Sequence, residues 1–190
     1  MRAAPLGFLI VGIVVGFAIV FTVVEQRAPT VIGARPAAVQ RPEPTGAPAV
    51  DVMRVQKLQQ DVRANPKNFE ALTELGNINF EQRNFPEAAN LYTRALELQP
   101  DNLDLRTDLG TVLFYSERVD DALREFNTVL AKIPNHPQAL FNMGVALLHG
   151  KNDPQGALAR WEKLVETNPT YPQIAMVKEQ IKTLKEEIKK

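Results

Sequence analysis

The sequence contains no cysteine, only one serine, Ser116, and two histidines, His136 and His149. Without cysteine the chain cannot form a disulfide, a thiolate metal site, a covalent haem attachment or a thiol nucleophile. One serine and two histidines leave little material for a hydrolytic triad. No phosphate loop, paired-carboxylate motif or nucleotide fingerprint accompanies them. The sequence therefore predicts a protein that is not an enzyme and that has no cofactor-binding or metal site.

An excess of charge of one sign is also missing, because 22 basic and 22 acidic residues cancel. A neutral chain is not typical of a protein built to bind nucleic acid, so we expect no nucleic-acid partner. The balance hides two unlike parts. Residues 1–50 carry four arginines and two glutamates, a net charge of +2, whereas residues 51–190 carry 18 basic and 20 acidic residues, a net charge of −2.

Residues 3–24 form a run of 22 residues without a charged side chain. As a helix this run would be roughly 33 Å long, enough to cross a hydrocarbon core of about 30 Å. It is too long for the apolar region of a cleavable signal peptide, which is the main alternative. A core helix would have a polar face, and this run has none. We therefore predict a transmembrane signal anchor over residues 1–24. Gly12 and Gly16 would allow close helix packing there, although glycine is common in membrane helices for other reasons.

Residues 25–50 contain five of the 14 prolines and many alanines, without a periodic apolar pattern. This composition predicts a disordered or semi-extended tether. Arg27, Arg35 and Arg41 follow the predicted anchor and favour a cytosolic side for the rest of the chain. Long domains cross membranes largely regardless of such charges, so the residues alone leave the side open.

Residues 68–171 repeat one chemical pattern every 34 residues, or 35 in the last repeat. Each repeat has a glycine, an alanine, an aromatic residue and a closing proline. These positions are Gly76, Ala88, Tyr92 and Pro100; Gly110, Ala122, Phe126 and Pro134; and Gly144, Ala157, Trp161 and Pro169. The small residues would let two helices approach closely, the aromatic residue would fill the space between hairpins, and the proline would end the second helix. Such a period predicts a stack of helical hairpins.

This pattern resembles the tetratricopeptide repeat (TPR) over about 69–102, 103–136 and 137–171. It departs at Arg106, where the family usually has a large apolar residue, and by one additional residue in the third turn, around 150–154. Asn68 and Asn102 suit helix N-caps, and Pro137 and Pro172 suit first helical positions.

Two flanking segments extend the predicted solenoid. Residues 51–67 resemble the helix of a degenerate half-repeat. Residues 172–190 have the apolar stripe of an amphipathic capping helix, with membrane-surface or calmodulin-type binding as the alternative. The predicted fold class is all-α: a TPR solenoid of three helix-turn-helix repeats over 68–171 with flanking helices, plus one N-terminal transmembrane helix.

The TPR resemblance implies a concave face lined by the first helix of each repeat. The residues that it places in this groove are Glu70, Thr73, Asn77, Phe80 and Glu81; Asp104, Thr107, Thr111, Phe114 and Tyr115; and Gln138, Phe141, Val145, Leu148 and His149, with Glu74, Asp108 and Asn142 beside them. No lysine or arginine is among them, whereas chaperone-binding TPR domains use such residues to clamp a terminal carboxylate. An acidic ligand would meet an unfavourable potential here.

The apolar members of this set, Phe80, Phe114, Tyr115, Phe141, Val145 and Leu148, form a predicted patch with an acidic flank. The patch predicts a protein partner that is an amphipathic helix or extended segment with aliphatic anchors and basic residues. Two alternatives stay open: a helix of the protein itself fills the groove, or part of the patch is core between repeats.

These observations predict a membrane-anchored adaptor or scaffold for the assembly or maturation of a membrane-associated complex. Residues 157–164 resemble the last repeat of TPR proteins of bacterial c-type cytochrome maturation, which are membrane-anchored and extracytoplasmic and hold the C-terminal helix of the apocytochrome. The resemblance implies a single-pass protein of the bacterial inner membrane with an extracytoplasmic domain. The alternative is a permanent structural subunit of a larger membrane complex.

Overall fold

The structure, a computed structural model, describes residues 51–189. The predicted anchor, with Gly12 and Gly16, and the predicted tether lie outside these residues and stay predictions. Among residues 51–189, none of the helices combines the length and the apolar character needed to cross a membrane.

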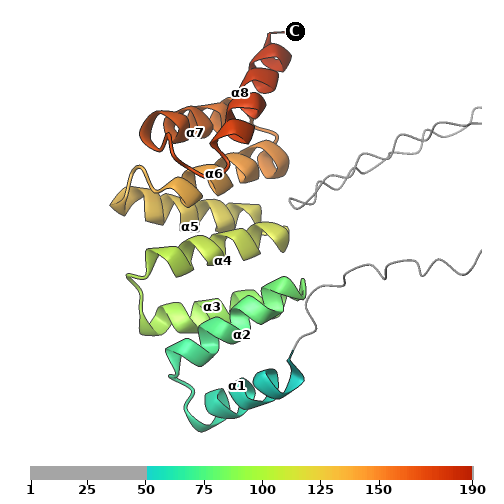
Figure 1. The fold of residues 1–190 in the computed structure, drawn as a ribbon, viewed down its shortest axis with the longest axis vertical. Coiled ribbons are helices and arrows are strands. Elements are labelled where there is room, and N and C mark those ends of the chain that lie inside the picture. Colours follow the sequence, from blue (N-terminus) through green and yellow to red (C-terminus); the bar gives the residue numbers. More distant parts are fainter. Residues whose placement is uncertain (1–50, 190) are drawn as a thin grey trace, which may run out of the picture. The chain divides into compact units, whose positions relative to one another are not determined.

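Residues 51–189 fold into helices only, and these helices stack in chain order (Figure 1). The elements are α1 (Val52–Ala64), α2 (Phe69–Glu81), α3 (Phe85–Leu98), α4 (Leu103–Tyr115), α5 (Val119–Lys132), α6 (Pro137–Val145), a π-helical turn η1 (Ala146–Gly150), α7 (Pro154–Thr167) and α8 (Ile174–Ile188). The first helices of the three repeats, called helices A, are α2, α4 and α6; the second, helices B, are α3, α5 and α7. The described part of the chain confirms the predicted all-α solenoid with a flanking helix at each end.

The helices A begin where the sequence predicts. The side-chain oxygens of Asn68 and Asn102 accept hydrogen bonds from backbone N–H groups three residues on, at 3.1 and 3.0 Å. His136 takes this place in the third repeat, where its Nδ1 accepts from the Ala139 N–H at 3.2 Å. The prediction for Pro172 is wrong, because α8 begins two residues later, after a turn.

The repeated glycines and aromatic residues pack against each other within each hairpin. A Cβ atom on the glycine would lie 2.2 to 2.6 Å from the ring of the aromatic residue, closer than atoms can approach. The pairs are Gly76 with Tyr92, Gly110 with Phe126, and Gly144 with Trp161. The aromatic ring therefore covers the glycine of its own repeat, and the expectation that it also fills the space between hairpins stays a prediction. Only hydrogen at this position lets the two helices approach this closely.

Arg106 occupies its unusual position through polar contacts. Its guanidinium donates to the Glu125 carboxylate at 2.7 Å and to the Pro100 carbonyl at 2.9 Å. Both charged side chains are about four-fifths buried, so the pair is shielded from water. This contact between α4 and α5 replaces the apolar contact usual in the family.

The additional residue of the third repeat is accommodated in the last turn of helix A, and not in the turn that follows the helix. In the first two repeats a turn N–H donates to a carbonyl five residues earlier, as from Asn84 to Asn79. In the third repeat the Asp153 N–H reaches back six residues to Leu147 at 2.9 Å, and residues 146–150 form the π-helical turn. A π-helical turn accommodates one extra residue without ending the helix.

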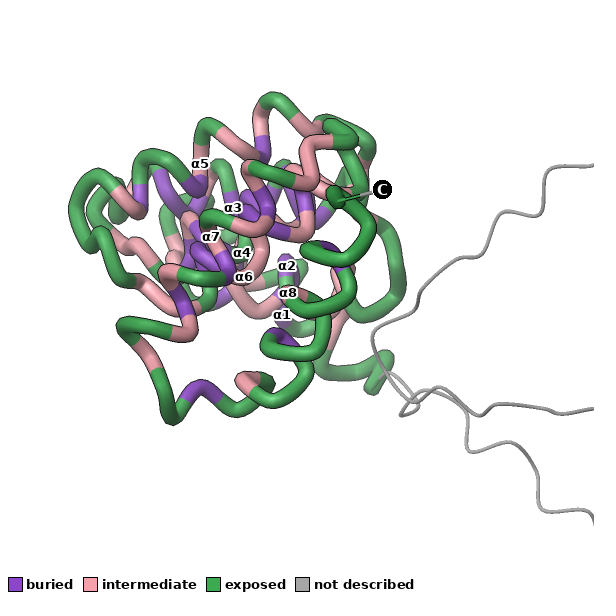
Figure 2. The backbone as a smooth tube through the Cα atoms, turned by 90° about the horizontal axis from the view of Figure 1, so that it is seen from above, coloured by how far each residue is buried: buried purple, intermediate pink, exposed green. Residues whose placement is uncertain are grey.

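Buried residues run along the middle of the stack and form two cores (Figure 2). The first core contains residues of α1 to α5, together with Met143 and Ala146. The second contains residues of α6, α7 and α8 and the preceding Tyr171. Leu130 and Leu147 pack against both. Repeats 1 and 2 therefore share one core, and repeat 3 builds its own with the C-terminal helix.

Candidate partner-binding groove

The predicted groove residues all lie on the helices A or in η1, but they differ in accessibility. Glu70, Asn77, Asp104, Tyr115 and His149 are exposed. Seven are half-buried: Thr73, Phe80, Thr111, Phe114, Phe141, Val145 and Leu148. Thr107 corrects the prediction, because its side chain is 1% exposed and its hydroxyl donates to the Leu103 carbonyl. A partner cannot reach Thr107, so its role is to pack α4 against its neighbours.

Four rings gather where the helices A of the first two repeats end, and we call them the aromatic cluster: Phe80, Phe85, Phe114 and Tyr115. The Phe85 and Tyr115 rings are stacked, with centroids 5.3 Å apart and an interplanar angle of 18°. Phe80 lies 5.8 Å from Phe85 and 5.9 Å from Tyr115, and Phe114 lies 5.5 Å from Tyr115. Tyr115 is 41% exposed, so the cluster presents an aromatic surface to solvent.

Phe85 was not among the predicted groove residues, because it begins helix B. The only signal in the sequence is that Phe85 is aromatic, five positions after Phe80, and directly precedes the proline in the first turn of α3. The turn between α2 and α3 brings it back beside Phe80. The guanidinium of Arg83, in the same turn, lies 5.7 Å from the Phe85 ring centroid.

A row of hydrogen bonds joins the polar groove positions of repeats 2 and 3 to each other. The Asn142 amide donates to the Thr111 hydroxyl at 2.7 Å, and the Gln138 amide donates to the Asn142 oxygen at 2.9 Å. Tyr171, which follows α7, donates from its hydroxyl to the Gln138 oxygen at 3.1 Å. The polar groups of the third repeat therefore bind one another and are not free for a partner's backbone.

The same tyrosine closes the apolar part of the third repeat. The Tyr171 ring lies 5.9 Å from the Phe141 ring and is 9% exposed. Phe141, Val145 and Leu148 pack against the core of the third repeat, whereas Phe80 and Phe114 pack against the core of the first two. The predicted apolar patch is thus divided between the two cores, and in its third-repeat part Tyr171 packs against Phe141.

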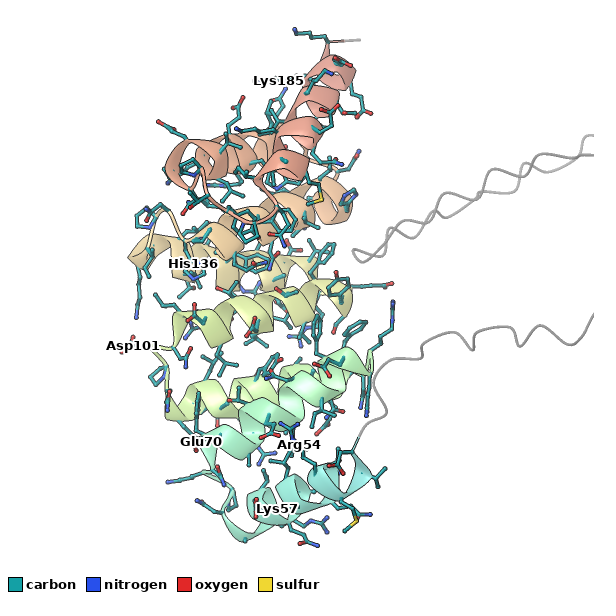
Figure 3. All side chains as sticks on the ribbon, in the orientation of Figure 1. Arg54, Lys57, Glu70, Asp101, His136 and Lys185 are labelled. Carbon is teal, nitrogen blue, oxygen red and sulfur yellow. The ribbon has the colours of Figure 1, made fainter. Side chains whose placement is uncertain are left out.

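The acidic flank of the groove is only partly neutralised. Glu74 forms an ion pair with Arg54 of α1. Figure 3 shows Arg54 beside α2. Asp104 faces the His136 ring, with its Oδ1 3.2 Å from Nε2. Within residues 51–189, Asp108 and Glu81 form neither a hydrogen bond nor an ion pair through their side chains.

Two pKa shifts reflect the charges of this flank. Burial raises the pKa of the Tyr92 hydroxyl, and the negative charges of Asp108 and Glu81 raise it further. That hydroxyl donates to the Asn77 oxygen at 2.7 Å. Desolvation also raises the pKa of Asp108, to which the Asp104 charge adds, although the residue is exposed. Asp108 and Glu81 thus add negative charge to the predicted groove.

One hollow of about 590 Å³ lies elsewhere, between α1, α2 and α3. Its lining is largely polar and includes Gln59, Asn79 and Asn90, but none of the predicted groove residues. In the described part of the chain, no group of three or more histidine, aspartate or glutamate side chains is placed to hold a metal ion. The aromatic cluster with its neighbouring carboxylates is thus the surface best suited to a ligand.

Comparison with known proteins identifies the repeats. Family profiles described as tetratricopeptide repeat match residues 79–140 and 138–171. No curated protein matches the chain.

Solved structures share the fold. A tetratricopeptide repeat protein from Parabacteroides merdae is 23% identical over 70% of this chain and 53% of its own length, with a TM-score of 0.60. YrrB, a TPR protein with an unusual peptide-binding site, is 24% identical over 66% of this chain and 64% of its own, with a TM-score of 0.60. The first TPR domain of RPAP3, bound to the HSP90 peptide SRMEEVD, is 20% identical over 64% of this chain and 94% of its own, with a TM-score of 0.57. Residues 79–171 thus match the tetratricopeptide repeat, and the chain shares the fold of these solved structures.

Proposed function

We propose that the protein is an adaptor whose TPR domain binds a segment of a partner protein on the concave face of repeats 1 and 2. The observation that carries this proposal is the aromatic cluster, which presents Tyr115 to solvent at the ends of the helices A that also carry the unpaired Asp108 and Glu81. Aromatic side chains dominate protein interfaces because they bury a large area with little loss of conformational freedom. The peptide ligands of RPAP3 and YrrB support a peptide segment as the ligand.

The role of an adaptor agrees with the rest of the domain. TPR domains are interaction scaffolds, and their repeats place side chains along a concave surface without building an enclosed pocket. The repeated pair of a glycine and an aromatic residue inside each hairpin serves packing. The surface residues of the helices A are left to choose the partner.

The finer part of the proposal concerns the membrane. Residues 3–24 would anchor the chain, and residues 25–50 would let the domain reach a partner near the bilayer. The resemblance of residues 157–164 to TPR proteins of c-type cytochrome maturation supports an extracytoplasmic domain in a bacterial inner membrane and a role in assembly or maturation. We propose a client of the same kind: a membrane-associated protein whose exposed segment is held during assembly.

Site-specific crosslinking in native membranes tests the proposal. A photoreactive phenylalanine analogue replaces Tyr115 in the full chain, and the same analogue replaces Ile133, which is 40% exposed at the end of α5, as the matched control. We expect a partner adduct from position 115 and none from position 133. Equal crosslinking at both positions, or none at position 115, would contradict the adaptor site.

The same membranes test the finer proposals. Protease added to sealed vesicles of known orientation cleaves the domain only if it lies on the accessible side. A partner that is captured only while it is being assembled supports the adaptor. Recovery of a stoichiometric complex after detergent extraction, independent of assembly, would instead show a permanent subunit.

A further inference from the structure

The proposed partner-binding surface combines an apolar part with a negatively charged part. The proposed adaptor role does not by itself require this combination. The surface lies on repeats 1 and 2, whereas in the third repeat Tyr171 packs against Phe141 and donates a hydrogen bond to Gln138. Its apolar part is the aromatic cluster. Its charge comes from Asp108 and Glu81, both of which act on the Tyr92 hydroxyl.

The sixth position of each helix A shows that the charge on Asp108 is unusual. In the first repeat this position is Glu74, which Arg54 neutralises. In the third it is Asn142, which is neutral and makes two hydrogen bonds. In the second it is Asp108, which is exposed and whose carboxylate has no hydrogen bond or ion pair within residues 51–189. A carboxylate in such a place is stabilised when a cation approaches it.

Basic side chains near this surface are mostly engaged within the domain. Arg118 pairs with Asp121, and Lys151 pairs with Asp120. Arg83 lies over the Phe85 ring, on the turn rather than on the helix A that carries Asp108. The predicted groove positions of the helices A therefore include acidic side chains and no lysine or arginine.

From this arrangement we infer that the aromatic cluster, with Asp108 and Glu81, recognises one class of ligand: an amphipathic protein segment with a large apolar anchor next to a lysine or arginine. This inference rests on the proposed adaptor function and specifies its partner. The anchor packs on the exposed Tyr115 ring of the cluster, and the cation pairs with Asp108 or Glu81. Acidic segments are rejected, because like charges across an interface are unfavourable.

Peptide binding to the full chain in mild detergent tests this inference. The probe is a fluorescently labelled 15-residue amphipathic peptide with leucines along one face and lysines beside them. Its partner peptide has glutamate in place of every lysine. We expect the lysine peptide to bind at least about tenfold more tightly, and its affinity to fall as salt is raised.

Variants of the protein locate the site. Tyr115→Ala should weaken the lysine peptide by about tenfold, as expected for an aromatic interface residue. Asp108→Asn should weaken it severalfold and should improve binding of the glutamate peptide. The matched controls are Ile133→Ala, equally exposed at another place, and Glu97→Gln, an exposed carboxylate on α3. These two should bind as the unchanged protein does.

Several results would overturn the inference. Equal binding of the two peptides, or no binding of the lysine peptide, would show that the surface does not select basic segments. Loss of binding in His149→Ala but not in Tyr115→Ala would place the site on the third repeat. In each case crosslinking at position 115 in native membranes would still report on the adaptor function separately.

Discussion

Repeats 1 and 2 and repeat 3 share one backbone plan but use their concave surfaces differently. Every hairpin has a glycine beneath an aromatic ring, and the rings are nearly inaccessible: Tyr92 is 2%, Phe126 0% and Trp161 3% exposed. The first two repeats leave an aromatic cluster open to solvent, whereas in the third repeat Tyr171 packs against Phe141 and donates a hydrogen bond to Gln138. The repeated residues thus build the solenoid, and the residues outside the repeat pattern decide which part of it can bind a partner.

The two cores predict that loss of an aromatic residue has different consequences at the two ends. Phe126→Ala and Trp161→Ala should each lower the free energy of unfolding by about 3–5 kcal/mol, because each empties a large buried volume. Phe126→Ala should weaken α2 to α5 together. Trp161→Ala should mainly weaken α6, α7 and α8, because repeats contact only their neighbours.

Hydrogen exchange resolved along the chain measures this difference. Amide protection should fall over the affected helices and be retained elsewhere. An exposed substitution on α5, Asn127→Ala, is the control and should leave protection unchanged. Uniform loss of protection over all helices in Trp161→Ala would contradict the division into two cores.

The glycines give the next largest effect. Gly110→Ala and Gly144→Ala should each lower the free energy of unfolding by about 1–3 kcal/mol, because the new methyl group overlaps the facing ring. Gly144→Ala should cost more, since its Cβ would lie 2.2 Å from the Trp161 Nε1, which donates to the Phe141 carbonyl at 3.1 Å. The change in Gly110→Ala displaces only carbon atoms of Phe126, the nearest at 2.6 Å.

Chemical denaturation of the two variants checks this order. The difference between them should appear in the denaturation midpoint, with little change in the slope. Equal midpoints for both variants and the unchanged chain would mean that the rings move aside freely, and that tight packing at the glycine does not hold the hairpins together.

The fold was predictable from the sequence because its determinants are local and repeated. Asn68 and Asn102 cap helices as expected, and the 34-residue period fixes which helices form hairpins. Each repeat contacts its neighbours, so the period alone specifies most of the packing. The π-helical turn could not be placed, because an extra residue can be absorbed either in the turn or in the last turn of the helix, at similar energy.

The site was less predictable, because it depends on contacts between residues outside the repeat pattern. Phe85 joins Phe80 across a turn, Tyr171 reaches back to Gln138, and Arg54 neutralises Glu74. None of these pairs occupies equivalent positions in successive repeats, so periodicity says nothing about them. Thr107 shows the converse: its repeat position predicts a groove residue, but packing between helices buries it.

The contact that closes the third repeat can be weakened selectively. Tyr171→Phe keeps the ring against Phe141 and removes the hydrogen bond to Gln138, so the free energy of unfolding should fall by about 0.5–1.5 kcal/mol. Tyr115→Phe is the matched control, because no hydrogen bond of the Tyr115 hydroxyl is present in the described part of the chain. It should leave stability unchanged. Thermal denaturation of both variants measures the two changes in stability. Equal changes would mean that the Tyr171 hydrogen bond does not stabilise the third repeat.

The smallest expected effect is that of Asp108→Asn, which should raise the stability of the fold rather than lower it. Desolvation and the Asp104 charge raise the pKa of Asp108 in the folded chain. The folded state therefore disfavours the charged form of the Asp108 carboxyl at neutral pH. A carboxyl whose pKa is higher when folded destabilises the protein above that pKa, and the destabilisation disappears as the pH falls below the pKa of the unfolded chain. Asp108→Asn should therefore raise the midpoint of thermal unfolding slightly at pH 7, and the gain should shrink as the pH is lowered through the acidic range.

Glu97→Gln, which removes an exposed charge from α3, is the control for this pH dependence and should show no such trend. If Asp108→Asn is more stable at pH 7 and yet binds the basic peptide more weakly, the carboxylate serves binding at the expense of folding. This combination would separate a functional acidic residue from a structural one, because loss of a structural carboxylate lowers stability. A fall in stability at pH 7 would instead assign Asp108 to the framework that repeats 1 and 2 share, and the contrast with the neutral Asn142 of repeat 3 would lose its functional meaning.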